Sequence, residues 1–324
     1  MKTILILYTS IGLGHKAIAE NFAYYLRKAG YSVLLQDILE VEEGWLSRLG
    51  TRIYLKMISA APWIWDWLYE SAFILKIFIP VRTFLAARNS DKTLEVIQRE
   101  RPDMVISTQV TASSIVSYLK SRGLYKGLFA VGFSDYHFHP AWMVPMVDAY
   151  FANIPSQKEE LVKKGVNFEK IFVTGIPLTP KLETNVVQVR ERLGIKEGKK
   201  VVLVAAGSLG IGMSKDLLKQ LASNAESHLI VVCGKNEKLQ TSLMNSFKGS
   251  SNVKILGYFT PMSDLYSVSS VFVSKPGGIS VAEALSWRLP MVVTHVLPGQ
   301  EAKNMDYLNA HRLVLDSREE STLR

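Results

Sequence analysis

Short continuous runs of apolar residues, many of them β-branched, recur along the chain between longer stretches of mixed polarity. Runs of this kind, bounded by glycine, proline or small polar residues, are typical of parallel strands that are buried on both faces. The stretches between them place apolar residues three or four positions apart, which is the spacing of an amphipathic helix. The alternation therefore predicts an α/β protein with parallel sheets.

The first half of the chain contains one set of these elements. A strand, a glycine turn, a helix and a second strand open the set, as in the mononucleotide-binding half of a Rossmann fold. Pro177 and Pro180 interrupt the pattern, so we place the end of this domain at residue 176. We expect strands at residues 4–8, 31–36, 104–107, 129–133, 149–152 and 171–173, and helices at residues 16–28, 91–101 and 112–120.

The second half of the chain restarts the same pattern. A glycine-rich turn at residues 206–212 follows its first strand, and a helix is expected from residue 263. The sequence therefore predicts two Rossmann-like α/β domains, one over residues 1–176 and one over residues 177–324. The strands of the second domain are expected at residues 200–205, 229–233, 253–256, 271–273, 291–294 and 312–315.

Composition narrows the class of protein. The chain has 324 residues, of which 48% are hydrophobic and 21% charged, as in a globular protein. A formal net charge of +9 favours an anionic partner, such as an anionic lipid surface or a phosphorylated substrate. Nucleic acid is disfavoured because there is no arginine-rich arm and no RNA-binding or zinc-finger signature. A single cysteine, Cys233, excludes an intramolecular disulfide and fits a reducing cytoplasm.

A glycine turn in the second half is the strongest chemical signal. Gly277 and Gly278 follow the expected strand at residues 271–273 and precede a helix, which we expect Ser280 to cap with Glu283 at capping-box spacing. Free N–H groups and the helix dipole make such a turn an anion site, best suited to phosphate. A lone Gly-Gly turn also recurs in ligand-free α/β units. The polar loop at residues 298–301, after the next strand, shifts the interpretation toward a nucleotide-sugar site.

The first glycine turn carries a histidine. Gly12 and Gly14 match part of the dinucleotide-binding fingerprint, but Ala17 fills its third glycine position. Asp37 could bind the ribose of such a cofactor, so an NAD-linked oxidoreductase stays an alternative. His15 stands at a helix N-terminus, where the dipole disfavours its charged form. A neutral imidazole can act as a general base. A lone histidine in a turn is, however, more often a capping or surface residue.

The segment at residues 44–84 differs from the rest of the chain in its aromatic and basic content. Tryptophan and tyrosine with basic residues on an apolar helix suit a membrane interface. The alternative is a helical insertion that packs its aromatic residues on its own domain. No apolar run reaches the roughly 20 residues that a membrane span needs. The tryptophans of the segment are Trp45, Trp63, Trp65 and Trp67.

Three further loops carry candidate chemistry. Asp135, His137 and His139 follow a strand end. The His-x-His spacing alone is weak evidence for a metal site, because no clear third ligand accompanies the two histidines. A polar lining for a substrate pocket is favoured instead. The turn at residues 206–212 is similar to a phosphate cradle without the Walker lysine and serine. Tyr258 and Phe259 follow a glycine and form a plausible base-recognition loop.

These motifs together resemble the diacylglycerol glycosyltransferases of glycosyltransferase family 28. That group includes the monogalactosyldiacylglycerol synthases and the processive diacylglycerol glucosyltransferases, and it is related to the lipid II-forming N-acetylglucosaminyltransferase. The resemblance implies the GT-B fold, in which two Rossmann-like domains face each other across an interdomain cleft. The motifs lie in the family's order and cover nearly the whole chain, at residues 12–15, 134–142, 173–177, 257–259, 274–283 and 298–304.

The resemblance also implies roles for individual residues. His15 would face the acceptor hydroxyl as general base, with Asp135 as its partner or rival. Glu283 would bind the ribose hydroxyls of UDP. The remaining donor-site residues would be Gly207, Ser208, Gly277, Gly278 and Ser280 at the diphosphate, Tyr258 and Phe259 at the uracil, and Gln300, Glu301 and Asn304 at the sugar. The acceptor-site residues would be Gly12, Gly14, His139 and Trp142.

The activity that this resemblance implies is the inverting transfer of a hexose from UDP-glucose or UDP-galactose to diacylglycerol, forming a β-glycoside. It implies no metal and no cofactor, and a cytoplasmic enzyme attached peripherally to the anionic inner face of the cell membrane. Alternatives are a GT-B transferase or epimerase with a soluble or other lipid acceptor, and a non-catalytic lipid- or nucleotide-binding relative. Family members usually run some tens of residues further, into a C-terminal helix that returns to the first domain. This sequence stops at Arg324, so we expect either a naturally short product or an incomplete sequence.

Overall fold

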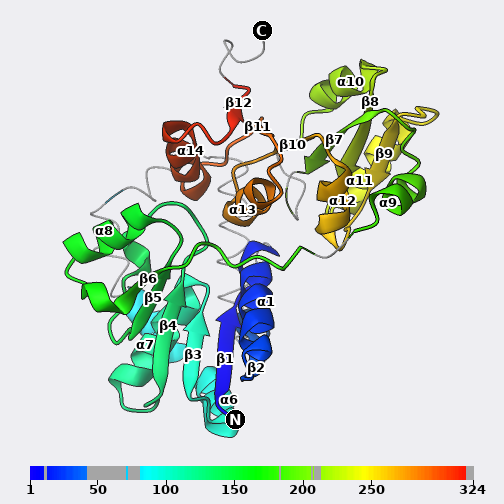
Figure 1. The fold of residues 1–324 in the computed structure, drawn as a ribbon. Helices are drawn as coiled ribbons and strands as arrows, with labels where there is room; N and C mark the ends of the chain where they lie inside the picture. Colours follow the sequence, from blue (N-terminus) through cyan, green and yellow to red (C-terminus); the bar gives the residue numbers. More distant parts are fainter. Residues whose placement is uncertain are drawn as a thin grey trace. The chain divides into compact units, whose positions relative to one another are not determined.

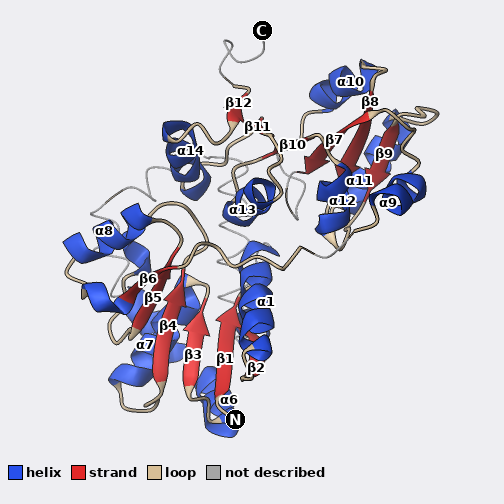
Figure 2. Cartoon of the chain, in the orientation of Figure 1, coloured by secondary structure: helices blue, strands red, loops and turns tan. Residues whose placement is uncertain are grey.

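The structure, a computed structural model, describes residues 1–10, 13–41, 71, 81–181, 184–205, 207 and 213–318. The chain divides into two compact units, Met1–Thr179 with Pro298–Gln300, and Pro180–Leu297 with Glu301–Arg324. Each unit contains a six-stranded parallel sheet with helices packed on it (Figures 1 and 2). The predicted α/β class with two Rossmann-like halves is therefore confirmed.

The first sheet has the strand order β2-β1-β3-β4-β5-β6, and the pairs between its neighbouring strands are parallel. The order reverses at β1, and such a reversal is where α/β sheets bind ligands, beyond the carboxyl ends of the strands. The strands are β1 (Thr3–Tyr8), β2 (Ser32–Asp37), β3 (Met104–Ser107), β4 (Leu128–Gly132), β5 (Ala149–Ala152) and β6 (Ile171–Val173).

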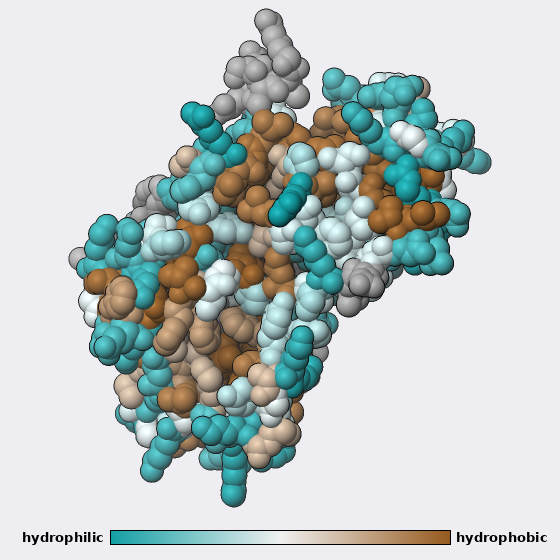
Figure 3. Space-filling view, viewed as in Figure 1, coloured by the Kyte–Doolittle hydropathy of each residue, from teal (hydrophilic) through white to brown (hydrophobic). Residues whose placement is uncertain are grey.

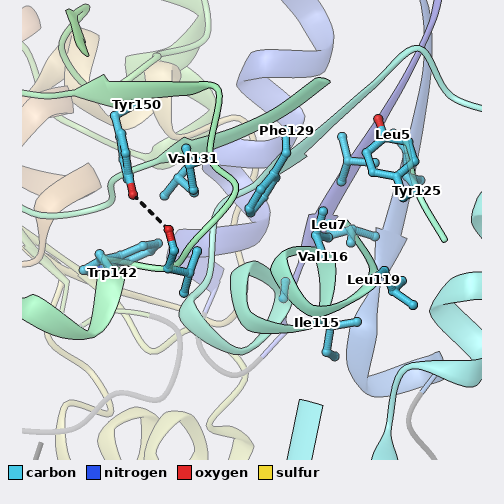
Figure 4. Close-up of a cluster of buried hydrophobic side chains, with 14 of the residues drawn as sticks. Leu5, Leu7, Ile115, Val116, Leu119, Tyr125, Phe129, Val131, Trp142 and Tyr150 are labelled. Carbon is cyan, nitrogen blue, oxygen red and sulfur yellow. Dashed lines mark hydrogen bonds between the residues drawn. The ribbon is translucent and has the colours of Figure 1, made fainter. Parts of the chain in front are cut away.

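Side-chain alternation along β1 distributes the core of this unit over both faces of the sheet. Leu5 and Leu7 are buried on the face that packs against Ile115 of helix α7 (Figure 4). Ile4 and Ile6 are buried on the opposite face, against helix α1. The helices are α1 (Leu13–Lys28), α2 (Ile38–Val41), α6 (Asp91–Glu100), α7 (Val110–Ser121) and α8 (Pro155–Lys163), with short 3₁₀ turns at Pro140–Trp142 and Phe168–Lys170.

The second sheet has the strand order β12-β11-β10-β7-β8-β9 and is also parallel. Its strands are β7 (Lys200–Ala205), β8 (Ser227–Val232), β9 (Val253–Leu256), β10 (Val271–Ser274), β11 (Met291–Val293) and β12 (Leu315–Asp316). Its helices are α9 (Val186–Leu193), α10 (Lys215–Ser223), α11 (Glu237–Ser246), α12 (Met262–Val268), α13 (Gly278–Ser286) and α14 (Gln300–Ala310).

Two predicted boundaries differ from the structure in ways that bear on the site. Helix α1 begins at Leu13, three residues earlier than expected, so His15 lies in its first turn. The prediction that Ser280 caps the next glycine-turn helix is wrong. The N-cap of α13 is Gly277, and Ser280 lies inside the helix, because the glycine turn tightens into helical geometry directly after Gly277.

The surface of each unit combines hydrophilic groups with apolar patches (Figure 3). In the first unit, Leu128 and Phe172 are half exposed or more, at 57% and 50%. No helix in the described ranges has both the length and the apolar character to cross a bilayer. The aromatic segment predicted at residues 44–84 lies outside the described residues, apart from residue 71 and residues 81–84.

Candidate functional site

His15 lies in the first turn of α1, directly beyond the carboxyl end of β1. Its backbone carbonyl accepts a hydrogen bond from the Thr108 hydroxyl, at 3.3 Å, which ties the helix start to the end of β3. Burial lowers the pKa of His15, while the charge of Asp135 and a backbone hydrogen bond with Thr108 act in the opposite direction. Its Nδ1 is buried and has no hydrogen-bond partner. The imidazole is therefore neutral at neutral pH, and its Nδ1 is not engaged in a hydrogen bond.

Asp135 follows β4 and lies close enough to His15 for its charge to raise the pKa of the imidazole. The carboxylate accepts a hydrogen bond from the Ser134 hydroxyl at 2.6 Å, and only 8% of the residue is exposed. Asn153 and Gln157 donate to its backbone carbonyl at 2.9 and 2.8 Å. The structure thus brings together the two residues predicted for acid–base chemistry and fixes the loop that carries Asp135.

The predicted acceptor-site residues have different surroundings. His139 Nδ1 accepts a hydrogen bond from the Ala141 backbone at 3.2 Å and so caps the 3₁₀ turn that follows. Trp142 is 8% exposed and meets the Phe133 ring edge-on, at 5.3 Å between centroids. Gly14 lies in α1 with open space where a Cβ would stand. Gly12 lies outside the described residues.

The glycine turn of the second unit leads into α13 as a bare helix start. Gly277 is the N-cap and offers no side chain to the first-turn N–H groups of the helix. Gly278 and Ser280 lie in that first turn. Such N–H groups, at the positive end of a nine-residue helix, are suited to an anion such as a diphosphate.

Glu283 lies one turn further along α13. Its Oε2 accepts a hydrogen bond from the hydroxyl of Tyr266 on α12, at 2.8 Å. Burial raises the pKa of Glu283, and the hydrogen bond from Tyr266 opposes that shift. The carboxyl is thus held in place by a neighbouring helix and titrates closer to neutrality than a solvated glutamate.

The loop after β10 is tied to helix α14 by two contacts. Glu301 is 5% exposed; one carboxylate oxygen pairs with Lys275 Nζ and the other accepts from the Leu297 backbone at 3.1 Å. Asn304 is fully buried and donates to the Pro276 carbonyl at 3.0 Å. The residues predicted to bind sugar hydroxyls thus already make hydrogen bonds within the protein that shape the glycine turn.

Sequence reasoning missed Lys275, although a lysine between a buried strand and Pro-Gly-Gly was a usable signal. Gly207 has a φ of +68°, and a Cβ there would lie 3.0 Å from Lys275 Cε, so glycine makes room for the lysine. A pocket at the carboxyl ends of β7, β10 and β11 includes Lys275, Thr294 and His295 in its lining. A cation thus stands at the edge of the sheet where the glycine turns emerge.

The remaining donor-site residues lie at loop ends. Tyr258 is 60% exposed, and the guanidinium of Arg192 lies 6.0 Å from the centre of the Phe259 ring. Gln300 is the first residue of α14. Ser208 lies outside the described residues. Within the described residues, no three histidine, cysteine, aspartate or glutamate side chains are grouped as metal ligands would be.

Comparison with known protein families assigns the chain to a family through the sequence of its first unit. Residues 15–178 match the family model described as monogalactosyldiacylglycerol (MGDG) synthase, which is about half of the chain. The chain belongs to the MGDG synthase family. Residues 201–320 match the model of the glycosyltransferase family 28 C-terminal domain, so the family assignment extends over both units. The predicted resemblance is confirmed.

The sequence similarity of this MGDG synthase family member to curated relatives extends over almost its whole length. A processive diacylglycerol beta-glucosyltransferase of Bacillus pumilus is 29% identical over 333 residues, covering 98% of the chain and 85% of the relative. The protein of the same name from Bacillus subtilis is 26% identical over 331 residues, covering 98% and 86%. The similarity thus runs through both units.

Solved structures agree on the fold of the MGDG synthase family member. MurG of Acinetobacter baumannii matches with a TM-score of 0.57 at 15% identity, covering 98% of this chain and 85% of MurG. A UDP-GlcNAc 2-epimerase from Neisseria meningitidis, bound to UDP-GlcNAc, matches with a TM-score of 0.59 at 15% identity, covering 97% and 87%. At this identity the likeness supports the GT-B fold alone.

Proposed function

We propose that this chain is an inverting glycosyltransferase that moves a hexose, glucose or galactose, from its UDP-sugar to diacylglycerol. The product is a β-glycosyl diacylglycerol. The observation that carries the proposal is membership of the MGDG synthase family, supported by near full-length similarity to proteins named processive diacylglycerol beta-glucosyltransferase. The bare start of α13 and the held carboxylate of Glu283 supply the anion and hydroxyl contacts that a nucleotide-sugar needs.

The nucleotide of the donor binds in the second unit. The diphosphate lies against the first-turn N–H groups of α13, with Gly277, Gly278 and Ser280 around it, and against the turn at Gly207. Glu283 accepts hydrogen bonds from the ribose hydroxyls, and Tyr258 and Phe259 flank the uracil. Gln300, Glu301 and Asn304 line the part of the site that holds the sugar. Glu301 contributes by holding Lys275 and the Leu297 backbone in place, and Asn304 by its bond to the Pro276 carbonyl.

The chemistry is a single displacement at the anomeric carbon. The acceptor hydroxyl attacks this carbon while the neutral imidazole of His15 takes the hydroxyl proton, and the bond to the UDP oxygen breaks. Attack from the face opposite to UDP turns the α-linked donor into a β-glycoside. The negative charge that develops on the diphosphate is stabilised by the positive end of α13. Asp135 stabilises the imidazolium that forms on His15.

The acceptor resides in a membrane, so we place the enzyme on the anionic inner surface of the cell membrane as a peripheral protein. The excess of nine positive charges over the chain favours that surface. This attachment would bring His15 to a lipid whose hydroxyl is at the headgroup level.

The deciding experiment measures UDP release by the purified chain with UDP-glucose or UDP-galactose and vesicles that contain diacylglycerol and anionic lipid. Lipid-dependent release with one sugar supports the proposal and identifies the donor. Release without lipid indicates a soluble acceptor or hydrolysis, and UDP binding without release indicates a non-catalytic relative. An absence of UDP binding contradicts the donor site.

A further inference from the structure

Two helices of the second unit present a side-chain pair that the reaction scheme does not by itself require. The hydroxyl of Tyr266, on α12, donates a hydrogen bond to Glu283 Oε2, on α13, over 2.8 Å. The two residues are 17 positions apart in the chain, so the contact arises from the packing of the two helices. The bond engages only one carboxylate oxygen of Glu283, the residue that the proposed function assigns to the ribose of the nucleotide.

The donor of this bond is itself fixed. Tyr266 is 4% exposed, and its ring meets Phe272 of β10 edge-on, at 5.5 Å between centroids. The centre of the Tyr266 ring also lies 6.5 Å from that of the Trp287 ring. The ammonium group of Lys181 lies over the Trp287 ring, 4.9 Å from its centre. A phenol packed in this way has few rotamers left, so its hydroxyl has a defined position.

We propose that Tyr266 is a positioning residue for nucleotide recognition: it fixes the Glu283 carboxylate through Oε2 and leaves Oε1 for the ribose hydroxyls. This inference rests on the proposed function, in which UDP binds at α13. A free glutamate on a helix surface samples several rotamers, and the binding of a ligand would have to restrict them. Anchoring one oxygen beforehand lowers that cost and directs the other oxygen.

The bond also affects ionisation. Burial raises the pKa of Glu283, and the hydrogen bond from Tyr266 lowers it. Among the described residues, the Tyr266 hydroxyl of α12 bonds to Glu283 itself, and Lys181 Nζ bonds to the Ser286 carbonyl at the end of α13. Because only the ionised carboxylate offers two acceptor oxygens, UDP affinity falls when Glu283 is protonated. Loss of the Tyr266 hydroxyl moves that fall to higher pH.

The test compares UDP dissociation constants of the full chain by calorimetry between pH 5 and pH 8. Tyr266→Phe removes one oxygen and keeps the ring. The matched control is Tyr150→Phe, which removes a hydroxyl bonded to the Val144 carbonyl from a similarly buried tyrosine in the other unit (Figure 4). Since every variant is titrated with the same ligand, the ionisation of UDP itself cancels in the comparison.

We expect Tyr266→Phe to weaken UDP binding by about tenfold at neutral pH, as for one hydrogen bond to a charged group, and to shift the acid fall in affinity to higher pH. Tyr150→Phe should match the wild type in both. Glu283→Gln should remove the share of the pH dependence that this residue causes, since an amide does not titrate.

Three outcomes overturn the inference. Wild-type affinity and an unmoved pH midpoint in Tyr266→Phe would leave the hydroxyl without a role in binding, while the proposed donor site survives. Unchanged pH dependence in Glu283→Gln would show that another group titrates, and this second variant decides the question if Tyr266→Phe does not fold. A wild-type chain that binds no UDP would overturn the inference together with the proposed function.

Discussion

At the scale of single residues, the burial of His15 has the clearest chemical consequence. A solvated imidazole is partly protonated near neutrality, whereas burial lowers the pKa of His15 and keeps it neutral. Its Nδ1 is buried without a partner, and Asp135 lies within range to stabilise the charged form after proton transfer. A group that is neutral at rest and becomes a stabilised cation during turnover has the properties of a general base.

Replacement of His15 by alanine tests that role. We expect His15→Ala to reduce kcat for UDP release by roughly 100-fold or more, the usual worth of a general base. The affinity for UDP should stay at the wild-type value, because the residues proposed to contact the nucleotide are in the other unit. Lys16→Ala is the control, since Lys16 is the next residue of α1 and its side chain is 43% exposed. A near-normal kcat for His15→Ala would remove this histidine from the mechanism.

Asp135 should act on the pH dependence of turnover. The negative charge of Asp135 raises the pKa of His15, so Asp135→Asn should lower that pKa further while the amide oxygen can still accept from Ser134. A base with a lower pKa stays unprotonated to lower pH, so the acid limb of the kcat/KM profile should move to lower pH. Ser117→Ala, which removes a buried hydrogen bond to Pro145, is the control with no expected shift. An acid limb that stays in place would separate Asp135 from His15.

At the scale of elements, strand β8 departs from the apolar pattern of its neighbours. All six of its residues are buried, yet it begins with Ser227 and His228. His228 Nε2 has no hydrogen-bond partner, and the nearby charges of Arg190 and Lys254 add to burial in lowering its pKa. The strand therefore contains a histidine that folding keeps neutral.

This histidine should make the stability of the second unit depend on pH. Because the folded-state pKa lies below the unfolded value of about 6.5, the unfolded chain binds the extra proton first as pH falls. Stability is therefore complete above this value and declines between it and the folded pKa. We expect the melting temperature to fall by several degrees between pH 7 and pH 5, and less steeply in His228→Gln. Parallel curves for the two proteins would exclude His228 as the cause.

Local patterns predicted most of the elements but few of the contacts that build the site. The β-branched runs identified the strands because a buried strand needs such residues over its whole length. The first two residues of β8 were missed since they are polar. Ser280 was wrongly expected to cap α13, because the capping-box spacing carries no information on where a glycine turn becomes helical. The pairs Lys275–Glu301 and Tyr266–Glu283 join distant segments, and periodicity does not report such contacts.

At the scale of the whole molecule, the two units carry separable tasks. The proposed general base, His15, and its charged neighbour Asp135 are in the first unit, and the proposed nucleotide contacts are in the second. Each substitution therefore has a primary readout, which is turnover for the first unit and UDP affinity for the second. The net charge, in contrast, belongs to the chain as a whole and bears on the proposed attachment to a membrane.

That charge predicts a dependence on salt and lipid. With a net charge of +9, UDP release on diacylglycerol vesicles should be faster with anionic than with neutral lipid, and raising the salt concentration should remove much of the difference. The screening length falls from about 10 Å at 0.1 M salt to about 3 Å at 1 M, which shortens the reach of the attraction. Sedimentation of vesicles with bound protein measures the attachment directly. Equal rates on both lipids at low salt would contradict an electrostatic attachment.

The position of β1 between β2 and β3 has a consequence for how the chain can change over evolutionary time. Both neighbours pair with β1, so the connection from β2 to β3 begins and ends beside the same strand. The entropy of closing such a connection grows only with the logarithm of its length, about 0.6 kcal/mol for each doubling. We therefore expect changes in the length of this connection to cost the sheet little, provided that α6 stays in place, because Val96 and Ile97 of α6 belong to the core of the unit.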